Sequence, residues 1–194
     1  AGQAEGAGMG GSACGCGRSP ISRTIPRPGF PPPGGRTRAI AMNVLSIQPW
    51  VARGLVDSGA SIACLNALGH EVWAVPTGLY SGPEGASTAT GRALGADQVG
   101  ELLAGIVKGG HVADCAAVLS GNLGAAETGA VVLDVVERVK TANPQALYLC
   151  DPEIGIGGRV YVQPGIQEFL RDRALGRADI LAPNEFELTL LAGV

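Results

Sequence analysis

The sequence lacks any long uninterrupted apolar run. No stretch of its 194 residues approaches the roughly 18 consecutive apolar residues that a membrane-spanning helix needs. The N-terminal region also lacks the apolar core of a secretory signal. The sequence therefore excludes a membrane-spanning helix and predicts no membrane partner.

Cysteine is scarce and odd in number. Five cysteines give no obvious disulfide framework, and Cys14 and Cys16 have no second pair of ligands nearby that would complete a zinc site. Cys64, Cys115 and Cys150 fall in apolar stretches, where a free thiol behaves as a small buried hydrophobe. These features predict a soluble protein of a reducing compartment, the cytoplasm.

Side-chain groupings typical of hydrolytic catalysis are missing as well. The two histidines, His70 and His111, are isolated at expected element boundaries, where they are predicted to face solvent. No Ser-His-Asp arrangement and no paired-carboxylate signal stands out.

Charge is unevenly distributed along the chain. Residues 1–41 carry five arginines and one glutamate among ten glycines and six prolines, whereas the remainder is acidic and the net charge is −3. Such a segment buries too little apolar surface to order itself, so 1–41 is expected to be a disordered leader ahead of a natural start at Met42. A transit peptide is the alternative, although no amphipathic helical pattern is present. The arginines lack interleaved aromatic residues, so no nucleic-acid partner is predicted.

From Met42 onward, expected strands alternate with expected helices. This order predicts a mostly parallel sheet covered by helices on both faces, with ligands bound beyond the carboxyl ends of the strands. The expected strands are 43–48, 71–75, 116–119, 146–150 and 179–181; the expected helices are 58–68, 96–107, 125–141 and 166–175; the expected loops are 81–92 and the mobile segment 155–158.

Polar residues follow the last two of these strands. Asp151 comes directly after 146–150, and Pro152 stops that strand; the carboxylate suits Mg²⁺ or a metal-bound polyphosphate, and a plain Asp-Pro turn is the alternative. Asn184 and Glu187 have the spacing of a capping box at a helix start. The same two side chains would face nucleotide phosphates and a metal, and the two roles are compatible.

Five segments, in this order, carry a family resemblance: MNVLSIQ, LGHEVWAV, AVLSG-x-LG, ANPQALY-x-CDP and APNEFEL. Together they resemble pyridoxal kinase, of the ribokinase-like superfamily, from Met42 to Val194. The resemblance implies a three-layer α/β/α fold with a mostly parallel sheet, of which 42–194 would be the N-terminal part. It also implies Mg²⁺-dependent transfer of phosphate from ATP to the 5′-hydroxyl of a vitamin B6 vitamer (pyridoxal, pyridoxine or pyridoxamine), and a homodimer.

On the nucleotide side, the resemblance implies roles for four residues. Asp151 matches the aspartate of the family's C-D-P segment, and Ala182, Asn184 and Glu187 match its nucleotide and metal segment. Asp151 and Glu187 are the implied metal positions.

On the substrate side, the chain departs from the family pattern. Thr77 and Ser81 match polar positions, but Pro49 stands where the family's I-Q-S has serine, and Asn122 stands where its S-G-Y has tyrosine. Glu84 ends the segment that replaces the family's F-S-N-H-T. The family's G-H-x-G-N turn becomes G-L-V-D-S at 54–58, and Glu153 replaces an apolar residue beside the metal position.

The sequence contains no G-x-G-D segment. In the family, the amides of G-T-G-D stabilise the transferring phosphoryl group, and its aspartate takes the proton of the substrate hydroxyl. The chain as given is therefore expected to be inactive. The alternatives are a non-catalytic remnant or pseudokinase, and another ribokinase-like small-alcohol kinase such as hydroxymethylpyrimidine kinase.

Overall fold

The computed structural model describes residues 41–83 and 88–193, all within one structural unit. The predicted leader 1–41, except Ala41, and Glu84 lie outside the described residues.

The centre of the fold is a six-stranded sheet with the order β3-β2-β1-β4-β5-β8. All neighbouring strands pair in parallel except β2 and β3, so the predicted mostly parallel sheet is confirmed. The strands are β1 (Asn43–Val51), β2 (Glu71–Tyr80), β3 (Gly91–Ala93), β4 (Cys115–Ser120), β5 (Leu147–Cys150) and β8 (Ile180–Leu181).

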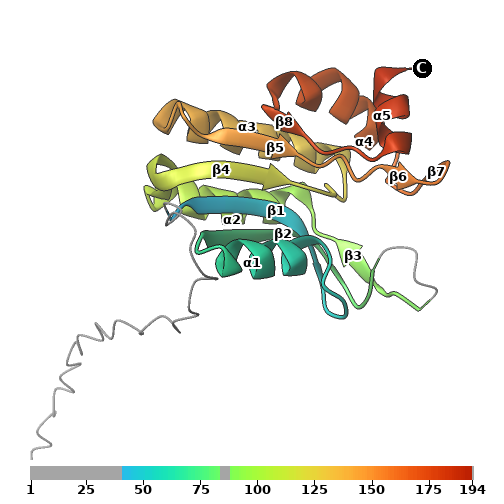
Figure 1. Ribbon diagram of the computed structural model, residues 1–194, viewed down its shortest axis with the longest axis horizontal. Coiled ribbons are helices and arrows are strands. Elements are labelled where there is room, and N and C mark those ends of the chain that lie inside the picture. The colour runs from blue at the N-terminus through green and yellow to red at the C-terminus, as the bar shows by residue number, and fades with distance from the viewer. Residues whose placement is uncertain (1–40, 84–87, 194) are drawn as a thin grey trace, which may run out of the picture. The chain divides into compact units, whose positions relative to one another are not determined.

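Helices cover both faces of this sheet, which gives the predicted three layers. Figure 1 shows α1 in front of the sheet and α2 and α3 behind it, where these two pack against each other. The α-helices are α1 (Asp57–Ala67), α2 (Ala96–Lys108), α3 (Ala126–Ala142), α4 (Ile166–Phe169) and α5 (Glu185–Ala192). A 3-10 turn, His111–Asp114, precedes β4, and α4 continues as a π turn, Leu170–Ala174, and a 3-10 turn, Leu175–Arg177.

The two faces of the sheet are held by different interactions. Behind the sheet, α3 contributes four buried valines to the core, Val132, Val135, Val136 and Val139. In front, α1 is tied to β1 by hydrogen bonds: the Ser58 hydroxyl donates to the Gln48 carbonyl oxygen at 3.0 Å, and Gln48 Nε2 donates to Ser61 Oγ at 2.9 Å. The carboxyl end of β1 is thereby fixed against the start of α1.

Cys64, which was expected to be buried, is exposed, and three expectations about secondary structure also differ from the structure. β1 and β2 run beyond 48 and 75, because pairing resumes at Trp50 after a register shift. The expected loop 81–92 contains β3, which pairs with the extended end of β2. The segment expected to be a mobile loop is the hairpin of β6 (Gly155–Ile156) and β7 (Arg159–Val160), which turns at Gly157 and Gly158 with φ of 59° and 85°.

No helix among the described residues is long and apolar enough to cross a membrane.

Candidate active site

Most of the predicted site residues lie near or beyond the carboxyl ends of strands in the sheet. Because the carboxyl ends of parallel strands meet at one edge, side chains from distant parts of the sequence gather there. β2 contributes Thr77, and the segments after β4, β5 and β8 contribute Asn122, Asp151 and Asn184.

Asp151 lies at the point where β5 leaves the sheet. Its backbone N–H donates to the Ser120 carbonyl oxygen at 2.8 Å, which holds the turn against β4. Burial raises the pKa of the Asp151 carboxyl to about 6, and the nearby charges of Glu187 and Asp57 act in the same direction. Above that pH the Asp151 carboxylate is an anion, and the acidic side chains of Glu187 and Asp57 lie nearby. Such a group of acidic side chains favours binding of a cation.

Asn184 and Glu187 form the predicted capping box at the start of α5. Asn184 Oδ1 accepts from the Glu187 N–H, and Glu187 Oε2 accepts from the Asn184 N–H, both at 3.0 Å. Glu187 is only 2% exposed, and its Oε1 accepts from the N–H groups of Ile154 and Gly155 at 2.8 and 3.2 Å. Asn184 Nδ2 donates to the Gly155 carbonyl oxygen at 2.8 Å. The pair therefore also fixes the β6–β7 hairpin beside α5 (Figure 1).

The two predicted metal positions differ in how their oxygens are used. The Glu187 carboxylate accepts three backbone N–H groups, whereas the described contacts of the partly buried Asp151 carboxylate include one, from Glu153. Within residues 41–83 and 88–193, no three His, Cys, Asp or Glu side chains come together as a metal ion would require. One available carboxylate is compatible with Mg²⁺, which binds through one or two carboxylates together with substrate phosphates.

Ala182 contributes through its backbone. Its N–H donates to the Cys150 carbonyl oxygen at 3.1 Å, which continues the pairing of β8 with β5 and leads the chain into Asn184.

Among the residues predicted for the substrate side, Thr77 and Asn122 are joined directly. The buried Thr77 hydroxyl donates to the Asn122 carbonyl oxygen at 2.6 Å, and Asn122 Oδ1 accepts from the Gly124 N–H at 2.9 Å. Pro49 is buried within β1. Ser81 is exposed, and its Oγ accepts from the Thr90 N–H at 2.9 Å across the loop between β2 and β3.

Asp57 and Glu153 belong to the same edge, although neither was predicted as a site residue. Their side chains share a hydrogen bond, and Glu153 Oε2 also accepts from the Asn122 N–H. Burial raises the pKa of both carboxyl groups, and the charge of Asp57 raises that of Glu153 further. The sequence held a signal: Asp57 stands at a glycine of the family's turn, and Glu153 at an apolar position.

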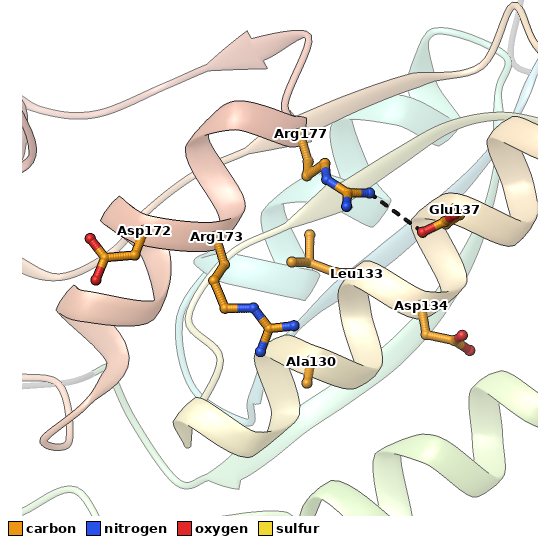
Figure 2. Close-up of a pocket in the computed structure, with 7 residues that line it drawn as sticks. All are labelled: Ala130, Leu133, Asp134, Glu137, Asp172, Arg173 and Arg177. Atoms are coloured by element: carbon orange, nitrogen blue, oxygen red, sulfur yellow. Dashed lines mark hydrogen bonds and ion pairs between the residues drawn. The ribbon is translucent and has the colours of Figure 1, made fainter.

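A hollow of about 470 Å³ lies away from this edge, between α3 and the turns that follow α4 (Figure 2). Its charged groups largely have partners: Arg177 bonds to Glu137 at 3.4 Å, and the Arg173 guanidinium lies 5.4 Å from the centre of the Phe169 ring. None of the predicted site residues lines it. The lining residues are Ala130, Leu133, Asp134, Glu137, Asp172, Arg173 and Arg177.

No protein-family model matches the chain. It is 47% identical over 153 residues to the pyridoxal kinase PdxY of Granulibacter bethesdensis, covering 78% of this chain and 54% of that protein. It is 48% identical over 154 residues to the corresponding protein of Rubrobacter xylanophilus, covering 79% and 53%. The solved pyridoxal kinase of Leishmania donovani, in complex with ADP and pyridoxamine, superposes with a TM-score of 0.75 at 29% identity, covering 78% of this chain and 53% of that one. The chain spans about half the length of these relatives. Over that half it is similar in sequence to pyridoxal kinases, and it has the corresponding part of their fold.

Proposed function

We propose that this chain forms the part of a pyridoxal kinase that binds the nucleotide phosphates and one side of the vitamer. The reaction is transfer of the γ-phosphoryl group of ATP to the 5′-hydroxyl of pyridoxal, pyridoxine or pyridoxamine. The observation that carries this proposal is the identity of 47–48% to bacterial pyridoxal kinases. Ligands of such open α/β sheets bind at the strand ends, where the matching positions lie.

On the nucleotide side, each residue has a distinct role. The Asp151 carboxylate would hold Mg²⁺ on the phosphates. The segment that follows Ala182 and includes Asn184 would line one side of the nucleotide site. Glu187 acts on the metal region mainly by holding the backbone of the hairpin, since its oxygens accept three N–H groups. Magnesium supplies the charge neutralisation that phosphoryl transfer needs.

On the vitamer side, the proposed contacts are Thr77, Asn122, Pro49 and Ser81, and the resemblance adds Glu84, which lies outside the described residues. A homodimer is the assembly that the homology favours, and sedimentation of the purified chain would test it.

The chain as given is expected to bind without transferring phosphate. Its sequence holds no G-x-G-D segment, and positioning with charge stabilisation accounts for nearly all of phosphoryl-transfer catalysis. Calorimetric titrations with Mg·ATP and with pyridoxine, alongside a kinase assay, separate binding from turnover. Binding of both ligands without product is the expected result. A flat titration of folded protein with both ligands contradicts the proposal and favours a non-catalytic remnant.

Two variants sharpen the nucleotide titration. Asp151→Asn removes the charge that would hold the metal and should weaken Mg·ATP binding about tenfold or more, the loss expected for one charged contact. Asp134→Asn is the control, because Asp134 is exposed on α3 and pairs only with Arg138 in the described contacts. Equal affinities for the two variants would remove Asp151 from the metal role.

A further inference from the structure

We propose that Glu153 is a positioning residue of the vitamer side, which fixes the loop after β4 by hydrogen bonds to the Asn122 backbone and to Asp57. The inference deepens the proposed function and rests on it, because Asn122 is one of the proposed vitamer contacts.

The Glu153 side chain lies across the ends of two strands. Its Oε2 accepts from the Asn122 N–H, and a Cβ placed on Gly121 would lie 2.9 Å from that oxygen and 3.0 Å from Gln48 Cγ. The carboxyl group therefore fills the space between the end of β1 and the start of the loop after β4. A larger residue at Gly121 would displace it.

Both backbone polar groups of Asn122 form hydrogen bonds. Its N–H donates to Glu153, and its carbonyl oxygen accepts from Thr77 Oγ1 at 2.6 Å. The bond between Glu153 and Asp57 extends this chain of contacts to the start of α1. Segments after β4 and β5, strand β2 and helix α1 thus share one hydrogen-bonded network. A residue fixed in this way presents its side chain in one direction, as substrate positioning requires.

The two carboxyl residues share an uncommon backbone conformation. Asp57 has a φ of 48° and Glu153 a φ of 43°. A positive φ in a non-glycine residue persists where the surrounding contacts over-determine it.

The test compares affinities for pyridoxine and for Mg·ATP in the full 194-residue chain. Glu153→Leu is similar in size and loses both hydrogen bonds, so pyridoxine affinity should fall about tenfold while Mg·ATP affinity stays within about twofold. Glu153→Gln keeps an acceptor for Asn122 and a donor for Asp57, and it should restore most of the lost affinity. Glu101→Leu, on the exposed face of α2, is the control.

A second variant, Asp57→Gly, keeps the proposal testable if Glu153→Leu does not fold. Asp57→Gly removes the same hydrogen bond from the other side, and glycine tolerates the positive φ at that position. It should fold and still lose pyridoxine affinity, whereas Asp57→Asn should retain it. If the pair were purely stabilising, its removal would lower the free energy of unfolding and leave both affinities of the folded protein unchanged.

The outcomes separate the two proposals. Pyridoxine binding that is equal in the wild type, Glu153→Leu and Asp57→Gly overturns the positioning role and leaves the proposed function standing. A wild-type chain that binds Mg·ATP but no pyridoxine overturns the positioning role and leaves only the nucleotide part of the proposed function, and a folded chain that binds neither ligand overturns both. Selective loss of pyridoxine affinity, with rescue by Glu153→Gln, supports both.

Discussion

Asp57, the first residue of α1, and Glu153, beyond the end of β5, share a side-chain hydrogen bond while both backbones lie in the left-handed region, with φ of 48° and 43°. Within residues 41–83 and 88–193 they are the two non-glycine residues with positive φ. Such a backbone costs on the order of 1–3 kcal/mol per residue, and it persists where surrounding contacts compensate. Here the shared bond and the Asn122 N–H supply that compensation.

Stability should depend on pH through Glu153. Burial raises the pKa of its carboxyl above the ordinary 4.5, so the folded protein keeps a proton that the unfolded chain releases above about that pH. The folded state then binds more protons than the unfolded state, and the free energy of unfolding falls as pH rises. Asp151, with a pKa raised from 3.8 to about 6, acts in the same direction over a narrower interval.

Urea denaturation at pH 5, 6.5 and 8 measures this dependence. The decline should be at most about 1.4 kcal/mol per pH unit for each proton involved. Glu153→Gln carries no titrating proton and should show a flatter decline across the same interval. Identical slopes for the wild type and Glu153→Gln would contradict the assignment.

Glu187 should be a major contributor to stability. Glu187→Ala leaves the N–H groups of Ile154, Gly155 and Asn184 without their acceptor, and we expect a loss of about 3 kcal/mol or more, measured by urea denaturation. Glu185→Ala, at the exposed first position of the same helix, is the matched control and should change stability by less than about 0.5 kcal/mol. Similar losses in both variants would show that the buried contacts matter little.

The same glycine-to-alanine change should have opposite signs in two helices. At Gly129 on α3 an added Cβ would collide with the Phe169 ring, so Gly129→Ala should destabilise by about 1–3 kcal/mol. At Gly105 on α2 no atom lies within 4 Å of the added Cβ, and Gly105→Ala should stabilise by up to about 1 kcal/mol. Thermal denaturation of both variants gives the signs directly. If both variants were stabilised, helix propensity would outweigh packing at Gly129. If both were destabilised, packing would outweigh helix propensity at Gly105.

Thr128 should tolerate loss of its hydroxyl. Its side chain is fully buried in α3, and Oγ1 has no hydrogen-bond partner among the described residues. Thr128→Val removes a buried polar atom at nearly constant shape, so stability should stay level or rise by up to about 1 kcal/mol. Thr128→Ser keeps the hydroxyl and loses a methyl group, and it should cost about 1 kcal/mol. A Thr128→Val variant clearly less stable than Thr128→Ser would indicate a partner for the hydroxyl.

The sequence alone was sufficient for the order of the main strands and helices and for the cap at the start of α5. Apolar runs bounded by turns predicted the parallel strands, because a strand buried on both faces must be apolar throughout. The spacing of Asn184 and Glu187 predicted the cap of α5, since a capping box is complete within four residues. The prediction for Asp151 rests on a similarly local feature, because this residue directly follows a strand that Pro152 ends.

Only the tertiary structure decided how these side chains are used. Glu187 accepts from Ile154 and Gly155, and Glu153 bonds to Asp57 and Asn122, across the ends of strands that are distant in sequence. Likewise, β3 exists because the extended end of β2 offers it a pairing edge. Periodicity and caps are local and can be read from a few neighbouring residues. Long-range hydrogen bonds and the burial that shifts a pKa arise only when the sheet brings separate segments together.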